Sequence, residues 1–199
     1  MKNELEQQLT DAGALKVGHF LLASGLHSDR YIEKFDLLRN PVATSHLIAR
    51  LADRFRDEAI DVVVGPTTGG ILLAFELARQ LGVQAAYAER VADGAQERTF
   101  KRGTSFQSGD RVLVIDDILT TGGSIRETLA ALGAQPVETV AVAVLVDRSG
   151  GRVQFGDVPL IPLLSLNVAA WEPSECPQCA AGVPLTKPGS TAAVSKTAP

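Results

Sequence analysis

A short run of the sequence, residues 116–124, combines the residue types that could hold a phosphorylated sugar. It contains the adjacent acids Asp116 and Asp117, followed by Thr120, Thr121, Gly122, Gly123 and Ser124. The loop leads directly into a helical pattern, and a helix N-terminus offers unpaired N–H groups and a partial positive charge. The glycines let backbone N–H groups approach an anion, and the hydroxyls add donors. We therefore predict a phosphate-binding loop here.

The two acids lie at the end of an apolar stretch, residues 112–115, that we expect to be a buried strand. Open α/β sheets bind their ligands at the carboxyl ends of strands. Two carboxylates beside a phosphate repel it unless they meet hydroxyls or a metal, so ribose hydroxyls or Mg²⁺ on a pyrophosphate are suitable partners. One alternative is a capping box, in which Ser124 and Glu127 only close the helix N-terminus. The run matches neither a Walker A loop nor Gly-x-Gly-x-x-Gly.

The elements around this run alternate between strand and helix patterns. Apolar spacing indicates helices near residues 3–14, 40–57, 71–81 and 125–132, and strands near 17–32, 61–64, 83–88, 111–115 and 137–146. Residues 91–110 are polar and indicate a long exposed loop with room for a short hairpin. The alternation predicts an α/β fold with a mostly parallel central sheet flanked by helices.

Length and composition limit the possible functions. The 199 residues suit one domain, and the net charge of −4 with 5% aromatic residues disfavours nucleic-acid binding. The N-terminal residues contain no apolar signal core, and no apolar stretch reaches the roughly 18 residues of a spanning helix, so we expect a cytoplasmic protein without a membrane partner. We expect a single domain over residues 1–186, comprising an N-terminal hood (1–40), a core (41–152) and a C-terminal extension (153–186), and a disordered tail over 187–199.

Residues 112–124 resemble the signature with which the type I phosphoribosyltransferases bind 5-phosphoribosyl-1-diphosphate (PRPP). This resemblance implies a type I phosphoribosyltransferase-like fold with a small hood formed by the N-terminal segment. It also implies that Asp116 and Asp117 hold the ribose hydroxyls, with Mg²⁺ carried nearby on PRPP, and that the loop holds the 5-phosphate. The implied PRPP-binding residues are Thr68, Gly69, Arg90, Asp116, Asp117, Ile118, Leu119, Thr120, Thr121, Gly122, Gly123 and Ser124.

Three further segments resemble the orotate phosphoribosyltransferases within that family. They are residues 20–31, residues 65–70, which match the loop that contacts pyrophosphate, and residues 145–148. The implied orotate-binding residues are Tyr31, Ile32, Thr120 and Arg148. The arginine also makes chemical sense, because a guanidinium can pair with the carboxylate of orotate through two parallel hydrogen bonds. The alternatives are an Arg148 that pairs with Asp147 at the surface and a Tyr31 that only packs in the core.

The resemblance implies transfer of the 5-phosphoribosyl group from PRPP to orotate, giving orotidine 5-monophosphate and pyrophosphate in de novo pyrimidine biosynthesis. It implies a homodimer with shared active sites and catalytic roles for Asp116, Asp117 and Lys101. The sequence lacks two lysines usual in the family, at Ala23 and near Gly69, and its mobile loop is divergent. We expect Arg90 and Lys101 to meet the pyrophosphate, and Arg98 and Arg102 to be solvated surface charges.

Two rival functions and one cysteine pair remain open. The chain could use another base, or it could be a non-catalytic PRPP-sensing regulator, which should carry a basic face or a DNA-binding extension. Cys176 and Cys179 have the spacing of a metal knuckle, but a structural zinc site needs about four ligands. The histidines lie far away in sequence, so we expect a reduced structural pair, with zinc or a disulfide as alternatives.

Overall fold

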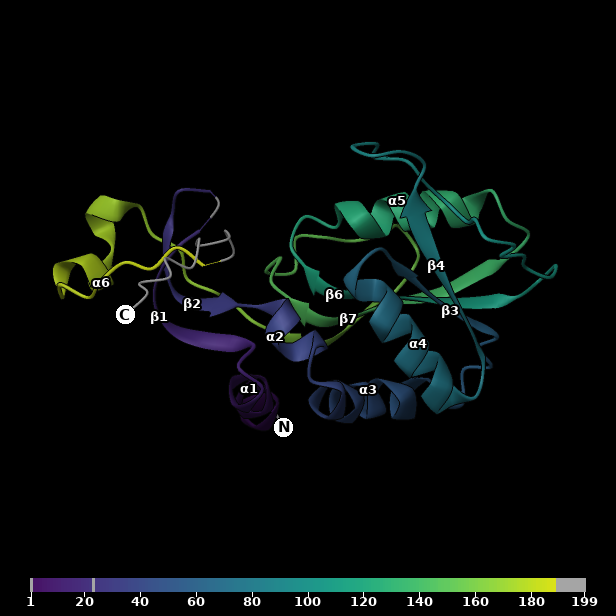
Figure 1. The fold of residues 1–199 in the computed structure, drawn as a ribbon, viewed down its shortest axis with the longest axis horizontal. Coiled ribbons are helices and arrows are strands. Elements are labelled where there is room, and N and C mark those ends of the chain that lie inside the picture. The colour runs from purple at the N-terminus through teal and green to yellow at the C-terminus, as the bar shows by residue number, and fades with distance from the viewer. Residues whose placement is uncertain (1, 23, 189–199) are drawn as a thin grey trace, which may run out of the picture.

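The computed structural model describes residues 2–22 and 24–188, and its centre is a six-stranded sheet (Figure 1). The strand order is β5-β4-β3-β6-β7-β8, and all neighbours run parallel except β5, which is antiparallel to β4. The strands are β3 (Val62–Pro66), β4 (Gln84–Arg90), β5 (Arg98–Thr99), β6 (Arg111–Leu119), β7 (Glu138–Asp147) and β8 (Leu160–Ser165).

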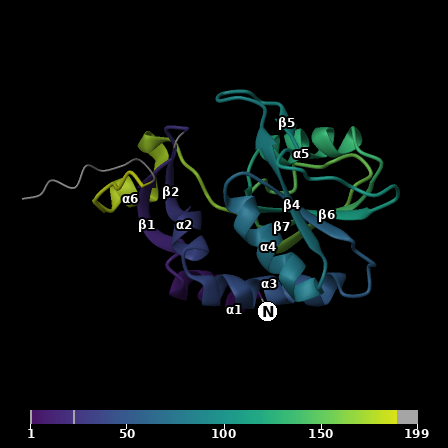
Figure 2. The ribbon, with the colours of Figure 1, turned by 45° about the vertical axis from the view of Figure 1, so that its right-hand side comes forward.

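Helices cover both faces of this sheet (Figure 2). On one face lie α3 and α4, with the short α2 beside them, and on the other lies α5. Their bounds are α2 (Lys34–Leu38), α3 (Pro41–Phe55), α4 (Gly69–Leu81) and α5 (Gly123–Gly133). The Asn40 side chain caps α3 by accepting a hydrogen bond from Ala43 N–H, and Gly82 ends α4 in the left-handed conformation.

Alternation along β6 divides the core into two apolar clusters. Leu113 and Ile115 face the helices α3 and α4, whereas Val112 and Val114 face the opposite side, together with Ile125 of α5. Successive side chains of a strand point to opposite faces, so residues of even and odd number along β6 meet different surroundings. This alternation continues into the two acids at the end of the strand.

The hood is a second, smaller layer beside the carboxyl ends of the sheet strands. It contains α1 (Lys2–Asp11) and the antiparallel hairpin of β1 (Leu15–Leu21) and β2 (His27–Ile32). The C-terminal extension returns to this hairpin through η1 (Pro173–Glu175) and α6 (Pro177–Ala180). Backbone hydrogen bonds join Trp171 to His27, and Thr186 to both His19 and Leu21, so the extension pairs with both hairpin strands.

The predicted α/β fold with its mostly parallel sheet and N-terminal hood is confirmed, with local corrections. The strand predicted for 111–115 continues to Leu119, and the helix α2 and the strand β8 were not predicted. Both were missed because they are short and weakly periodic. Of the possible hairpin in residues 91–110, only β5 lies within that segment, and it pairs with the end of β4, Glu89 and Arg90, just before it. The predicted disordered tail, residues 187–199, lies almost wholly outside the described residues. Among the described residues, the helices are all too short or too polar to span a membrane.

Candidate active site

The two predicted catalytic acids lie near the carboxyl end of β6 and point to opposite sides of the sheet. Asp116 faces α5, where its Oδ2 accepts a hydrogen bond of 2.6 Å from Ser124 Oγ. Asp117 faces the other helix layer, where Lys34 Nζ lies 3.1 Å from its Oδ2. Both acids are buried, with 7% and 5% of their surface exposed. They are therefore held in separate polar settings, although they are neighbours in sequence.

The surroundings of Asp116 disfavour the ionised form of its carboxyl group. Its burial, and then the neighbouring Asp117 carboxylate, raise the pKa of Asp116 from 3.8 to about 6, although the hydrogen bonds from Ser124 and from Asp117 N–H oppose this. Perturbed carboxylates of this kind concentrate at functional sites, because a structure rarely retains an unfavourable buried charge without a use for it. The arrangement suits hydrogen-bond donors such as sugar hydroxyls.

The predicted phosphate loop connects β6 to α5. Thr120, Thr121 and Gly123 are exposed, while Gly122 is buried in the left-handed conformation with φ of 78°. A Cβ atom on Gly122 would lie 2.9 Å from Val153 Cγ1. Both the left-handed backbone and the lack of space for a side chain therefore favour glycine at this position. Gly122 is also the N-cap of α5, which turns the first N–H groups of the helix toward the loop.

This geometry contradicts the capping-box alternative for Ser124 and Glu127. Ser124 Oγ donates to Asp116, and Glu127 Oε2 accepts a hydrogen bond of 2.9 Å from Arg98 Nε. Neither side chain caps α5, because the helix begins at Gly122 without a side-chain hydrogen bond. Ile118 and Leu119 direct their side chains into the two apolar clusters, so only their backbone atoms could meet a ligand.

The loop between β3 and α4 packs directly against Asp117. A Cβ atom on Gly69 would lie only 2.1 Å from Asp117 Oδ2, which explains why this position holds glycine. The peptide between Thr67 and Thr68 is cis. Asp117 Oδ2 is buried, and no well-aligned donor reaches it within residues 2–22 and 24–188, despite the nearby Lys34 ammonium. One carboxylate oxygen is thus left for a ligand beside this loop.

The two predicted base-contacting residues Arg148 and Tyr31 belong to the core and to the hood, respectively. Arg148 follows β7, and its N–H donates to Leu119 O at 2.9 Å. Its buried Nε finds no hydrogen-bond partner in the described part of the chain, and burial lowers its pKa. Asp147 instead accepts from Ser149 N–H, so the predicted alternative of an Arg148–Asp147 surface pair is wrong. Tyr31 is half-buried, its ring centroid lies 5.8 Å from that of Phe20, and burial, followed by the nearby Glu33, raises its pKa.

The predicted orotate contact Ile32 is buried in the core, with 6% of its surface exposed. It lines a small apolar cavity together with Lys34, Asp117 and Ile118. Ile32 therefore lies beside the acids, although its side chain packs against the cluster of α3 and α4.

The cations of the long loop divide into two groups. Lys101 Nζ donates to the carbonyls of Arg90 and Val91, at 3.0 Å and 3.3 Å, and Arg90 donates to Ala95 O, so both side chains fold back on the loop. Arg98 is different, because only 5% of it is exposed and it donates to Glu127, Thr67 and Ala88. The expectation that Arg98 is a solvated surface charge is therefore wrong: it ties β5 to α5 and to the loop after β3.

Lys34 is a candidate site residue that the sequence did not reveal. It begins α2, and its ammonium contacts both Asp117 oxygens, at 3.3 Å and 3.1 Å. The available signal was its place directly after the Phe20–Tyr31 motif, two residues beyond Ile32. The Lys34–Asp117 ion pair forms where the hood contacts the core, and a periodic sequence pattern does not predict such a contact.

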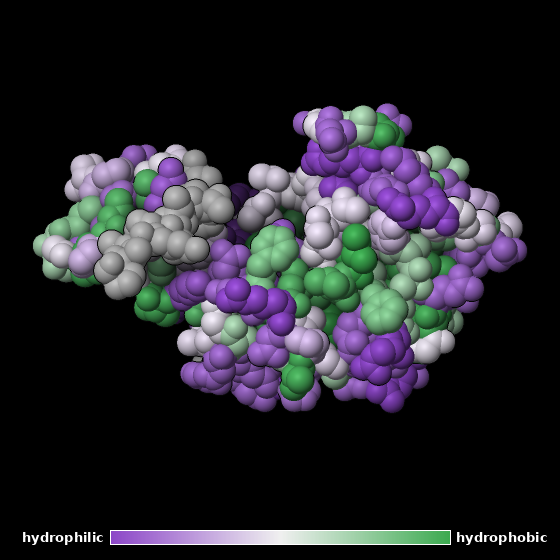
Figure 3. Space-filling model, viewed as in Figure 1, coloured by the Kyte–Doolittle hydropathy of each residue, from purple (hydrophilic) through white to green (hydrophobic). Residues whose placement is uncertain are grey.

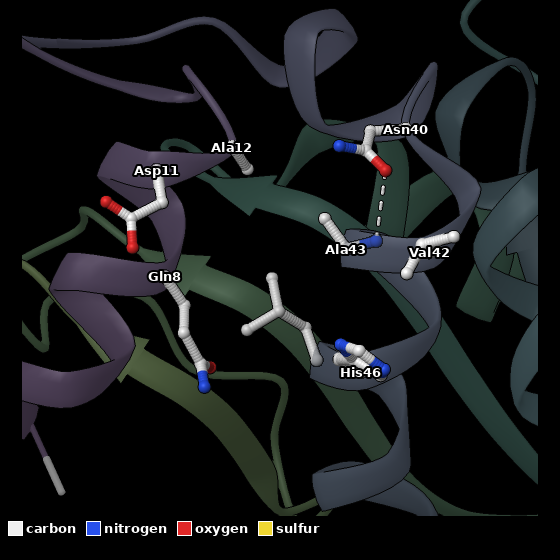
Figure 4. Close-up of a pocket in the computed structure, with 8 residues that line it drawn as sticks. Gln8, Asp11, Ala12, Asn40, Val42, Ala43 and His46 are labelled. Carbon is white, nitrogen blue, oxygen red and sulfur yellow. Dashed lines mark hydrogen bonds between the residues drawn. The ribbon is translucent and has the colours of Figure 1, made fainter.

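A broad surface groove lies elsewhere, between α1 and α3 (Figure 4). Gln8, Asp11, Asn40 and His46 contribute its polar groups, and Asn40 is already engaged in capping α3. None of the predicted site residues lines this groove. The acids, the two glycine loops and Arg148 gather instead at the carboxyl ends of β3, β6 and β7, where open α/β sheets place their ligands.

Comparison with known proteins agrees with this geometry. Residues 36–160 match the family model described as the phosphoribosyl transferase domain, which covers more than half of the chain. The protein therefore belongs to the phosphoribosyltransferase family.

The relatives define the group within that family. Orotate phosphoribosyltransferase of Caldicellulosiruptor bescii is 44% identical over 95% of this chain and 97% of its own length. That of Carboxydothermus hydrogenoformans is 46% identical over 94% of this chain and 97% of its own length. The crystal structure of orotate phosphoribosyltransferase from Aeropyrum pernix superposes with a TM-score of 0.64 at 29% identity, covering 81% of this chain and 93% of that one. Within its family, this chain is one of the orotate phosphoribosyltransferases.

Proposed function

We propose that this protein transfers the 5-phosphoribosyl group from PRPP to orotate, releasing pyrophosphate, in pyrimidine biosynthesis. The observation that carries the proposal is the pair of buried acids at the end of β6, each facing a glycine-containing loop. In the reaction, the bond from ribose C1 to the pyrophosphate oxygen breaks, and a bond from C1 to a ring nitrogen of orotate forms as that nitrogen loses its proton.

In this proposal, Asp116 and Asp117 accept hydrogen bonds from the ribose hydroxyls. The carboxylates also offset the positive charge that develops on the ring as the C1–O bond breaks. Thr120 to Ser124 hold the 5-phosphate with backbone N–H groups and hydroxyls at the N-terminus of α5. The exposure of the two threonines and the left-handed Gly122 support this role, because the loop is preformed and open to solvent.

Arg148 is our candidate for the orotate carboxylate. Its buried Nε leaves a donor without a partner in the described residues, and a bound carboxylate would supply one. Tyr31 lies on the hood strand β2, and we propose that its ring covers the base from the hood. Thr120 is the first residue of the phosphate loop, and in this proposal its hydroxyl also contacts the base.

The leaving pyrophosphate needs cationic partners. Lys34 is the cation nearest to the acids, and we propose that it turns from Asp117 toward PRPP when the ribose hydroxyls take its place. Thr68 and Gly69 border the same space, and Arg90 and Lys101 would approach from the long loop. Mg²⁺ prefers oxygen ligands, so the carboxylate oxygen Asp117 Oδ2, which has no hydrogen-bond donor in the described residues, suits it; bound to the pyrophosphate, the ion would neutralise part of the leaving group's charge.

We further propose a homodimer in which each long loop serves the partner's site. Within one chain, Lys101 and Arg90 hydrogen-bond to carbonyls of their own loop, and we propose that they exchange these partners for pyrophosphate in the partner's site. Hydrophobic side chains gather on the face that carries α4, beside α2 (Figure 3), and Phe35, Val42, Leu72 and Phe75 are each about half exposed or more. Such a patch is typical of an interface. We place the protein in the cytoplasm, where its free cysteines would remain reduced.

A substrate panel tests the proposed reaction. We expect orotate absorbance to fall only when PRPP and Mg²⁺ are both present, with one pyrophosphate released per orotate consumed. Adenine, hypoxanthine and uracil in place of orotate should give no pyrophosphate release. Turnover of one of these bases instead of orotate would establish the rival phosphoribosyltransferase, and PRPP binding without turnover of any base would establish the regulator.

Kinetics of Lys101→Ala test the loop separately. We expect a higher KM for PRPP and a lower kcat, because the variant removes a cation that would meet the pyrophosphate. Arg102→Ala is the matched control, since Arg102 is an exposed cation of the same loop that contacts Glu89. Equal constants for the wild type and the Lys101 variant would remove this lysine from the site.

A further inference from the structure

Four side chains from opposite ends of the chain converge in the hood. His19 of β1, His27 of β2, Cys176 and Cys179 each direct one ligand-type atom to the same place, and these atoms lie within 4.8 Å of one another. They are separated by up to 160 residues in sequence. Three of the four residues are buried. None of them takes part in the phosphoribosyl site described above.

The distances between these atoms match a tetrahedral metal site. His19 Nε2 lies 3.5 Å from Cys176 Sγ and 3.6 Å from Cys179 Sγ, and His27 Nδ1 lies 3.2 Å from Cys179 Sγ. Tetrahedral Zn²⁺ with bonds of about 2.3 Å to sulfur and about 2.0 Å to nitrogen separates such atoms by roughly 3.5 Å. The two imidazole nitrogens are 2.9 Å apart, so a small outward shift would admit the ion.

The surroundings of His19 also fit metal ligation. Its other ring nitrogen, Nδ1, lies 2.7 Å from the backbone carbonyl of Val183. A metal-bound histidine almost always donates its second N–H to a carbonyl or carboxylate, which fixes the ring and the tautomer. With Nδ1–H donating to Val183, the lone pair of Nε2 points into the cluster.

We propose that His19, His27, Cys176 and Cys179 bind one structural Zn²⁺ ion. Two thiolates and two imidazoles in tetrahedral geometry select zinc, and four protein ligands leave no open position for chemistry. The ion fastens the C-terminal extension to the hood hairpin, next to the backbone hydrogen bonds that Trp171 and Thr186 already make with it. Because the same hairpin carries Tyr31, the metal fixes the hood beside Arg148.

Metal analysis of the full-length protein tests the proposal. We expect one zinc per chain by mass spectrometry of the metal content, in protein purified under reducing conditions or after titration with zinc. Cys176→Ser and His27→Asn should each retain less than a tenth of that zinc. His46→Asn is the matched control, since His46 is the chain's remaining histidine and lies exposed on α3, and it should bind zinc fully.

Two measurements on the wild type avoid dependence on variants that fail to fold. Cobalt substitution should give the visible absorption of tetrahedral, thiolate-bound Co²⁺. Chelation of the zinc should lower the melting temperature by about 5 °C or more and speed hydrogen exchange in β1 and β2, but not in β3 or β6. A folded, reduced wild type that binds neither zinc nor cobalt, or a Cys176–Cys179 disulfide in the purified protein, would overturn the proposal.

Discussion

The proposed phosphoribosyl site and the cysteine–histidine cluster are assembled in opposite ways. The acids and the phosphate loop lie within nine consecutive residues, positioned by one strand and the helix that follows it. The cluster draws its four residues from the first 27 and the last 24 positions of the chain. One site is therefore a property of a local segment, and the other is a property of the tertiary fold.

This difference explains what the sequence could reveal. Order and spacing in residues 116–124 were enough to predict a phosphate loop, because strand, turn and helix N-terminus follow one another directly. The Cys176–Cys179 spacing suggested only half of a metal site. His19 lies 157 residues before Cys176 and His27 lies 152 residues before Cys179, and nothing in the sequence linked their strands to the C-terminal segment. Substitutions in the first region should therefore impair chemistry, whereas changes in the second should impair structure.

The largest effect is expected for Asp117→Asn. The substitution removes the charge beside the reacting sugar while keeping the shape, so we expect kcat to fall by about 100-fold or more. Stability should change little, because the partner Lys34 is 40% exposed and can be solvated. Steady-state kinetics and thermal melting measure the two quantities, and Asp157→Asn, at an exposed turn, is the control. An unchanged kcat would contradict the assignment of the acids.

Arg148→Gln should affect one substrate selectively. Loss of a charged, partly buried partner for a carboxylate should raise the KM for orotate by about 10- to 100-fold, equivalent to about 1.4–2.8 kcal/mol. The KM for PRPP should stay within about twofold, because Arg148 directly follows β7 and is not part of the phosphate loop. Equal increases in both constants would instead indicate a general loss of structure at this strand end.

Asp116→Asn should make the fold more stable at neutral pH. The pKa of Asp116 is raised from 3.8 to about 6, so the native state binds this proton more tightly than the unfolded chain, and stability falls as pH rises between these values. Removing the charge should add about 1–3 kcal/mol at pH 8 and almost nothing at pH 3. Urea unfolding at both pH values checks this, and an equal change at both would contradict it.

The smallest effect links the two regions. Removing metal from the cysteine–histidine cluster should raise the KM for orotate by only about two- to fivefold, because the hood would position Tyr31 less well. The KM for PRPP should not change, since β6 and α5 lie in the core. Kinetics before and after chelation, with zinc added back as the control, measure this. A loss of PRPP binding on chelation would contradict the separation of the two regions.

Other outcomes divide along the same line between local and long-range features. The alternating strands and helices predicted the parallel sheet, and the resemblance predicted the family, and both are confirmed. Two residues escaped prediction: Lys34, which reaches Asp117 across the junction of hood and core, and Arg98 of β5, whose buried side chain reaches Glu127 of α5. The ion-pair partners and the exposure of such residues depend on which elements pack together, and the spacing of residues within a segment does not predict that packing.

The most direct test of the central claim is PRPP binding by a variant changed only in the phosphate loop. Gly122→Ala adds one methyl group that conflicts with Val153 and with the left-handed backbone, whereas Gly133→Ala, in open space at the end of the same helix, does neither. Calorimetry with PRPP and Mg²⁺ should show equal affinity for the wild type and Gly133→Ala, and at least about tenfold weaker binding for a folded Gly122→Ala. Equal binding by all three proteins would contradict the placement of PRPP at residues 116–124.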